Sequence, residues 1–234
     1  MRGLTVCGVL VMSAWVVDRA AGQAGDTWRE REFGVGVVAY AAMGTYAAVD
    51  VIRVGPAWTA DTVAVLNRDS LCFMASGRCV RSYDRMIEYG YEIPGFAIIA
   101  FTRDSSWARV TLDPANRGDP PTGWVAINGG TVTRLLWSEI LPRHGLTFIH
   151  PDSVRFFSGP EATAAVGLSL VVDSRGPDYF MRPLKVQGRW LMVEVESPST
   201  FCRYPAPVTQ RDTVWIEYLT PRWRPRVFYS TRGC

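Results

Sequence analysis

One sequence design occurs twice in this chain and decides its fold. The first copy is WARVTL at Trp107–Leu112, a Pro- and Gly-rich loop, and GWV at Gly123–Val125. The second copy is WLMVEV at Trp190–Val195, another Pro-rich loop, and VWI at Val214–Ile216. Short runs of β-branched and aromatic residues bounded by Gly and Pro are typical of strands. The sequence therefore predicts an all-β protein in which one structural unit is used twice.

Each unit begins with a strand that stops at Gly-Pro, VIRVGP at Val51–Pro56 and VRFFSGP at Val154–Pro160. In the first unit a second strand is expected at Thr62–Leu66, and Arg103–Ser106 has the residue types of a hairpin connection into Trp107. Side chains alternate between the two faces of a strand, so Trp107 and Leu112 point in opposite directions. One face of Trp107 is therefore expected to be partly exposed.

The domain organisation follows from the repeat. With 234 residues, of which 48% are hydrophobic, the chain is long enough for two small cores. We expect a signal peptide at 1–24, an N-terminal arm at 25–45 and β domains at 46–130 and 151–234, joined by a connector at 131–150. The apolar spacing of Val132, Leu135, Leu136 and Ile140 predicts a short helix in that connector, with Pro142 as its stop. The segment Phe33–Val51 is predicted to be a strand or a strand pair.

The N-terminal segment predicts export. Met1 and Arg2 precede an apolar run at Leu4–Val17. Small residues at Gly22 and Ala24 offer a cleavage site just after Ala24, although Asp18 and Arg19 make the region before it more charged than usual. The run is shorter than a membrane span, which needs about 20 residues. We therefore expect a secreted or periplasmic protein with no membrane span after signal cleavage; an uncleaved anchor is the alternative.

Cysteine usage agrees with an oxidising compartment. Cys7 leaves with the signal peptide, and an even number of cysteines remains, which favours disulfides over free thiols. Three pairings are possible, and proximity in the sequence favours one disulfide in each unit. The mature cysteines are Cys72, Cys79, Cys202 and Cys234. No two of them have zinc-ligand spacing, and neither histidine lies near a cysteine, so no metal and no cofactor are expected.

Charge argues against nucleic acid as a partner. The net charge is +3, the arginines are scattered, and no run of five or six like charges occurs. These charges are expected to lie on an ordinary solvated surface. The protein is expected to be a monomer.

The ordered motifs resemble the bacterial SH3-like (SH3b) domain, whose opening strand with Gly-Pro matches Val51–Pro56. The hairpin tryptophan of that family matches Trp107, and its closing motif matches Gly123–Val125. The resemblance covers most of residues 50–128 and, more weakly, 152–219, where Val214 replaces the closing glycine; the excursion at 70–92 is longer than such domains need. The resemblance implies two small SH3-like β-barrels with a short helical connector.

The same resemblance implies recognition of short cell-wall or protein peptides in an aromatic groove. Aromatic side chains suit this task because they offer rigid contact area at low entropic cost. The alternative for each is ordinary packing within a small β domain. The candidate ligand-binding residues are Trp58, Tyr91, Trp124, Tyr179 and Trp215.

Catalytic patterns are weak. His144 and His150 are the only histidines, both beside turn residues, and only Asp152 is a nearby acid. No nucleophile elbow and no Gly-rich phosphate loop is present. We therefore expect a non-catalytic binding or scaffold protein; the alternatives are an extracytoplasmic hydrolase that uses a histidine and a purely structural envelope protein.

Overall fold

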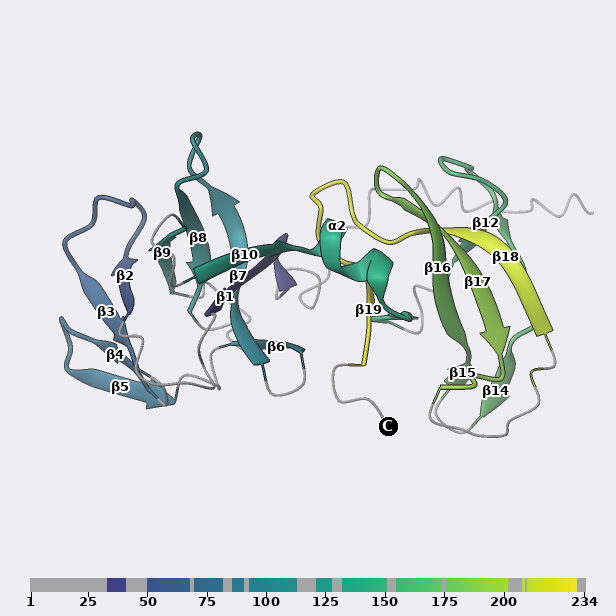
Figure 1. Cartoon of the computed structure of the whole chain (residues 1–234), viewed down its shortest axis with the longest axis horizontal. Coiled ribbons are helices and arrows are strands. Elements are labelled where there is room, and N and C mark those ends of the chain that lie inside the picture. Colours follow the sequence, from purple (N-terminus) through teal and green to yellow (C-terminus); the bar gives the residue numbers. More distant parts are fainter. Residues whose placement is uncertain are drawn as a thin grey trace, which may run out of the picture.

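The computed structural model describes residues 33–40, 50–67, 70–81, 86–90, 93–112, 121–127, 132–150, 155–173, 176–201, 208 and 210–230. These residues form an all-β protein, as predicted. Two large sheets lie beside each other along the long axis, with a short helix between them (Figure 1). Within this part of the chain, none of the helices has the length and apolar character needed to cross a membrane.

The strands of the first sheet are β1 (Gly36–Tyr40), β2 (Asp50–Val54), β3 (Val63–Leu66), β4 (Ser70–Phe73), β5 (Arg78–Arg81), β6 (Ile87–Gly90), β7 (Ile93–Phe101), β8 (Trp107–Thr111), β9 (Thr122–Ala126) and β10 (Val132–Leu136). They pair antiparallel in the order β10-β1-β7-β8-β9-β2-β3-β4-β5, and β6 also pairs with β7. The strand predicted within Phe33–Val51 is β1, which lies between β7 and β10.

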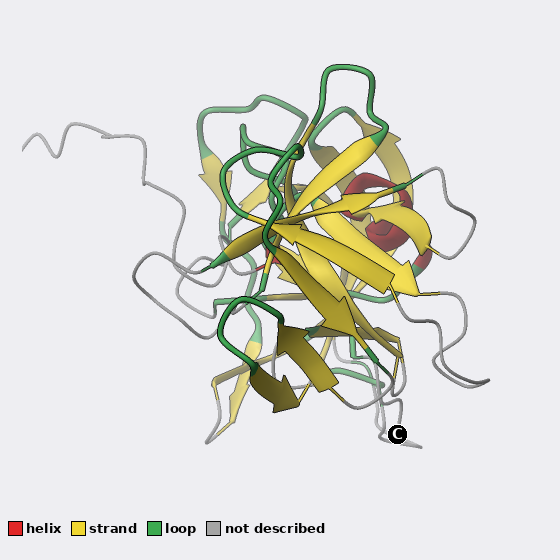
Figure 2. Ribbon diagram, turned by 90° about the vertical axis from the view of Figure 1, so that its left-hand side faces the viewer, coloured by secondary structure: helices red, strands yellow, loops and turns green. Residues whose placement is uncertain are grey.

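The remaining strands are β11 (Thr147–Phe148), β12 (Phe156–Phe157), β13 (Ala165–Val166), β14 (Val171–Asp173), β15 (Gly176–Asp178), β16 (Phe180–Gln187), β17 (Trp190–Ser197), β18 (Gln210–Glu217) and β19 (Val227–Phe228). Five of them form the second sheet in the order β13-β12-β18-β17-β16, and the others form the pairs β11-β19 and β14-β15. In the end-on view the short helical segment is drawn in red beside the yellow strands (Figure 2).

The two sheets contain the same five-stranded arrangement. The order β7-β8-β9-β2-β3 in the first sheet corresponds to β16-β17-β18-β12-β13 in the second. The register also repeats, because the residue two places after each repeat tryptophan faces the tryptophan of the next strand. Those pairs are Arg109 with Trp124 and Met192 with Trp215. The twofold use of one design in the sequence is therefore matched by equivalent strand pairing.

The predicted disulfide of the first unit is confirmed. Cys72 in β4 and Cys79 in β5 lie directly opposite each other, with 4.0 Å between their Cα atoms, and are joined as a disulfide. The bond closes the β4–β5 hairpin within the excursion at residues 70–92. Cys202 and Cys234 lie outside the described residues, as do Cys7, the predicted signal peptide and Tyr91.

The predicted short helix in the connector is present, but it begins only at Trp137. Val132–Leu136 is the strand β10, which pairs along its whole length with β1, and helix α2 covers only Trp137–Ile140. The β-branched Val132 and Thr133 favour extended backbone, and the hydrogen-bonding partner offered by β1 decides the outcome. The helix is capped by Glu139, whose carboxylate accepts a hydrogen bond from the backbone N–H of Leu136 at 3.3 Å.

The region after β10 joins the two sheets through a shared hydrophobic core. Trp137 is fully buried, its Nε1 donates to the backbone oxygen of Phe33 at 2.8 Å, and its ring packs edge-on against Phe228. Tyr229 donates its hydroxyl hydrogen to the backbone oxygen of Tyr89 in β6. The core of the second sheet also includes three residues of the first, namely Val37, Ile87 and Ala97. The two units therefore pack on each other in addition to being linked by the chain.

Candidate functional site

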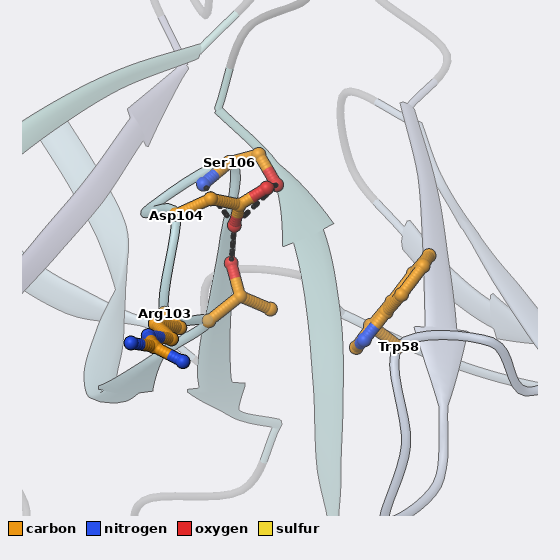
Figure 3. A pocket seen from close by; sticks show the side chains of 5 residues that line it. Trp58, Arg103, Asp104 and Ser106 are labelled. Atoms are coloured by element: carbon orange, nitrogen blue, oxygen red, sulfur yellow. Dashed lines mark hydrogen bonds between the residues drawn. The ribbon is translucent and has the colours of Figure 1, made fainter.

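The candidate site is a pocket between two loops of the first unit. One loop follows β2 and carries Trp58; the other is the turn of the β7–β8 hairpin. The pocket has a volume of about 540 Å³ and is lined by Trp58, Thr102, Arg103, Asp104 and Ser106. Figure 3 shows Trp58 on one side and the hairpin residues on the other. The pairing of β2 with β9, and of β9 with β8, brings these distant segments together.

Trp58 forms one wall of the pocket and packs against Trp107. The ring centroids of Trp58 and Trp107 are 6.0 Å apart, with their planes tilted by 30°. The guanidinium carbon of Arg53 lies 5.5 Å from the ring centroid of Trp107 and makes a cation–π contact. Arg53 also donates from Nη1 to the backbone oxygen of Ala60 at 3.2 Å, which ties the Trp58 loop to β2. Trp58 is 47% exposed, so part of its indole ring is open to solvent while Trp107 supports it from within the protein.

The opposite wall is a tightly hydrogen-bonded turn. The Asp104 carboxylate accepts hydrogen bonds from the Thr102 hydroxyl at 2.6 Å and from the Ser106 backbone N–H at 3.2 Å and hydroxyl at 2.8 Å. The Thr102 hydroxyl in turn accepts a hydrogen bond from the backbone N–H of Trp107 at 3.1 Å. Ser105 adopts a left-handed backbone conformation with φ of 57°, which this network holds.

The same hydrogen bonds set the charge of Asp104. The Thr102 hydroxyl, and after it the N–H and hydroxyl of Ser106, stabilise the ionised carboxylate and lower its pKa to about 2. Asp104 is therefore an anion at neutral pH, and its carboxylate oxygens accept the hydrogen bonds that hold the turn. It is poorly suited to proton transfer. Arg103 beside it is exposed, and within the described residues no acidic side chain pairs with it. Its guanidinium can therefore donate hydrogen bonds to a ligand.

The predicted ligand-binding residues of the first unit have different environments. Trp58 lines the pocket, whereas Trp124 is only 8% exposed and faces Arg53 and Arg109 across the sheet. The Nε1 atom of Trp124 is buried and has no hydrogen-bond partner in the described part of the chain. Trp124 therefore presents little surface to a ligand in this conformation.

The predicted ligand-binding residues of the second unit do not lie together. Tyr179 is 8% exposed, and its hydroxyl oxygen accepts a hydrogen bond from the backbone N–H of Phe148 at 3.1 Å. Burial raises the pKa of Tyr179 to about 12. Trp215 is half-buried in β18, opposite Met192 and Phe157.

Sequence reasoning predicted Trp58 as a site residue but missed the other four residues that line the pocket and the two that support Trp58. Arg53 and Trp107 were placed on strands, and Asp104 was placed in a hairpin turn, but none was predicted to lie near Trp58. The hairpin pattern was a usable signal for the turn. The turn lies close to Trp58 because of long-range strand pairing, which no local sequence pattern encodes.

The histidines do not form a recognisable reactive centre. His144 stacks on Tyr229 with 4.2 Å between ring centroids, and burial, followed by the charge of Arg143, lowers its pKa. In the portion of the chain described, no three His, Cys, Asp or Glu side chains gather in a geometry that would hold a metal ion.

Comparison with known proteins gives no further guide to this site. No family model, no curated protein and no solved structure matches the chain.

Proposed function

We propose that the protein is an exported, non-catalytic binding or scaffold protein with tandem SH3-like domains, and that its Trp58 pocket binds a short cell-wall or protein peptide. The observation that carries this proposal is the exposed indole of Trp58, stacked on Trp107 and facing a pocket of about 540 Å³. Pockets of about 300–1,000 Å³ are typical of small-ligand sites. This volume accommodates a few residues of an extended peptide.

The chemistry of the two walls suits a peptide. The open face of Trp58 provides flat apolar area for a proline ring or an aliphatic side chain. On the other wall, Arg103 supplies donors for a peptide carbonyl or a carboxylate. Asp104 holds the turn, so the backbone that carries Arg103 keeps its place relative to the Trp58 loop before the ligand arrives. Such pre-organisation lowers the entropic cost of binding.

The repeated five-stranded arrangement supports the SH3-like proposal. Both units have a three-stranded meander whose third strand pairs with the strand that ends at Gly-Pro. Short antiparallel strands in this order are compatible with two small barrels, in which alternate side chains fill the interior.

Export is supported by the disulfide between Cys72 and Cys79. Disulfides of this kind persist in oxidising compartments and are rare where glutathione keeps thiols reduced. The apolar N-terminal run of the sequence points in the same direction. A periplasmic or secreted location would bring cell-wall peptides within reach of the pocket.

The test is retention of the full chain on purified peptidoglycan and on an array of short peptides. Trp58→Ala should lower affinity for the best ligand by about tenfold or more, because exposed tryptophans that become buried on binding are frequent hot spots. Trp223, also 47% exposed but in the second unit, provides a matched control as Trp223→Gly. Equal binding by the wild type and Trp58→Ala, or no retention above a heat-denatured sample, would count against the proposal and favour a purely structural role.

A further inference from the structure

One face of the first sheet carries tryptophan and arginine side chains beside the Trp58 pocket. Alternation on β8 places Trp107 and Arg109 on the same face, and both are half-buried. Ala108 and Val110, on the other face of β8, are fully buried in the core. The face that carries Trp107 is therefore the outer face of the sheet. It continues into the pocket, because the ring of Trp107 packs against Trp58.

A row of three directly opposed residues crosses this outer face. Arg109 in β8 faces Trp124 in β9, and Trp124 faces Arg53 in β2. Side chains of directly opposed residues lie next to each other on one face of a sheet. A guanidinium group and an indole N–H can donate hydrogen bonds but cannot accept them. The row therefore offers donors and no strong acceptor.

Few of these donors are used within the described residues. Arg53 donates from Nη1 to the backbone oxygen of Ala60 at 3.2 Å, and Arg109 donates from Nε and Nη2 to a single atom, Oγ1 of Thr122, at 3.2 and 3.0 Å. The indole N–H of Trp124 is buried without an acceptor. No acidic side chain in the described part of the chain forms an ion pair with either arginine. Charges that are partly withdrawn from water are normally paired, so this row lacks a counter-ion.

The pocket beside the row also has more positive than negative charge. Arg103 is exposed and has no ion pair among the described residues, and Figure 3 shows it across the pocket from Trp58. The carboxylate of Asp104 is occupied by hydrogen bonds within its own turn. Three arginines against the two aspartates of the surrounding loops leave a charge of +1, counting Arg53, Arg103, Arg109, Asp61 and Asp104.

We propose that the peptide bound at the Trp58 pocket is acidic and that Arg103 binds one of its carboxylates. This inference rests on the proposed function and narrows its ligand class. A guanidinium group matches a carboxylate with two parallel hydrogen bonds, while an adjoining apolar part of the peptide packs on Trp58. Arg53 and Arg109 add the positive potential that attracts such a ligand. The carboxylate can belong to an acidic side chain or to the C-terminus of the peptide, since both present the same two oxygens.

The size of the charge favours a peptide over a single-stranded nucleic acid. Proteins that bind single strands line a groove with cations that follow the phosphate backbone. Here the two loops and the row together carry a net charge of only +1. One carboxylate balances this charge, whereas a strand with one phosphate per nucleotide exceeds it.

The test is the affinity of the full chain for a matched set of short proline-containing peptides, measured by fluorescence anisotropy. Each peptide carries glutamate or glutamine beside the proline and ends in a free carboxylate or an amide, and the glutamine form with an amide is the neutral reference. The wild type should bind a carboxylate-bearing form about tenfold more tightly than the neutral one, because hydrogen bonds to charged groups are the stronger ones. This preference should shrink at about 1 M salt. Comparison of the glutamate form with the free C-terminus identifies the source of the carboxylate.

Arg103→Gln should abolish the preference. The acidic forms should lose about tenfold in affinity, while the neutral form should bind as it does to the wild type. Arg134→Gln is the matched control, because it removes another exposed arginine of the first sheet and changes the net charge equally. The guanidinium carbon of Arg134 lies 5.9 Å from the ring centroid of Phe101, which is opposite Ala108 and so on the other face from Trp107. Arg134→Gln should keep the full preference.

The outcomes separate this inference from the proposed function. Equal affinity for acidic and neutral peptides that is still lost in Trp58→Ala would overturn the inference and leave the peptide site standing. If no peptide bound in a way that depends on Trp58, both would be wrong. An equal loss of preference in Arg103→Gln and Arg134→Gln would overturn the inference, because the attraction would then come from the overall charge. So would single-stranded DNA that binds more tightly than every peptide and is released in Arg103→Gln.

Discussion

Replacing Gly123 with alanine is a direct test of how β9 packs against β2. A Cβ atom at this position would lie 2.4 Å from Cγ2 of Ile52, 3.2 Å from Cδ1 of Leu112 and 3.3 Å from the backbone oxygen of Arg53. Ile52 is fully buried and Leu112 is 1% exposed, so neither has open space to move into. The contacting atom of Ile52 is also a branch at Cβ, where the side chain is stiff.

The expected magnitude follows from two opposing effects. Overpacking of a buried site costs about 1–3 kcal/mol. Loss of unfolded-state entropy in a glycine-to-alanine change offsets about 0.4–1 kcal/mol of that cost. Gly123→Ala should therefore lower the free energy of unfolding by about 1–2 kcal/mol. Gly167 has no atom within 4 Å of a built Cβ, so Gly167→Ala is the matched control and should leave stability unchanged or slightly raised.

Urea unfolding followed by tryptophan fluorescence measures both variants under the same conditions. Ile52→Leu removes the Cγ2 branch, so combining it with Gly123→Ala should recover about 1 kcal/mol relative to the sum of the single changes. If Gly123→Ala were as stable as Gly167→Ala, or if the double variant showed no coupling, the close packing of β9 on β2 would be wrong.

Three further predictions concern stability. Trp223→Gly should raise the free energy of unfolding by up to about 1 kcal/mol, measured by the same urea titration, because it relieves the left-handed backbone of a bulky residue; a loss of stability would mean that the indole packs rather than projects. Replacing both Cys72 and Cys79 with serine should cost about 2.5 kcal/mol by the loop-entropy relation, and a change below about 0.5 kcal/mol would contradict a stabilising hairpin clamp. Stability should also fall as pH rises from 10 to 12, because burial raises the folded-state pKa of Tyr179 and Tyr229 from the ordinary tyrosine value of 10.0 to about 12. The two tyrosines contribute their full stabilisation below the pKa of tyrosine in the unfolded chain, and this contribution is lost as the pH rises through their pKa in the folded protein. If urea titrations showed the same free energy of unfolding from pH 10 to 12, the burial of these tyrosines would be wrong.

The strands were predictable because their signals are local. Alternation predicted that one face of Trp107 is partly exposed, and Trp107 is half-buried in the structure. The pairing of Cys72 with Cys79 also followed from proximity in the sequence. By contrast, Val132–Leu136 carries both a helical spacing and β-branched residues, and the choice was made by β1, a strand more than ninety residues earlier.

The site was less predictable because exposure depends on what covers a residue. Trp58 and Trp124 look equivalent in the sequence, yet Trp58 is 47% exposed and Trp124 is 8% exposed. The difference arises because Trp124 is on β9, inside a sheet with neighbours on both sides, whereas Trp58 is on the loop after β2. No periodicity in the chain encodes the position of the Thr102–Ser106 turn opposite that loop.

The repeat also explains why only one unit is proposed to bind a peptide. Arg53 and Phe157 occupy the same position, two residues before the Gly of each Gly-Pro, and they face Trp124 and Trp215 in the same register. In the first unit the guanidinium of Arg53 lies over the ring of Trp107, a polar contact compatible with an open surface.

In the second unit the same place is filled by apolar packing. Phe157 meets Trp190 edge-on, with 5.1 Å between ring centroids. The position of Trp58, three residues after the Gly of Gly-Pro, is taken by Ala162. Without an indole above the middle strand and a guanidinium beside it, the second unit lacks the tryptophan wall of the Trp58 pocket. The proposed peptide site is therefore confined to the first unit, although the two units share one strand order.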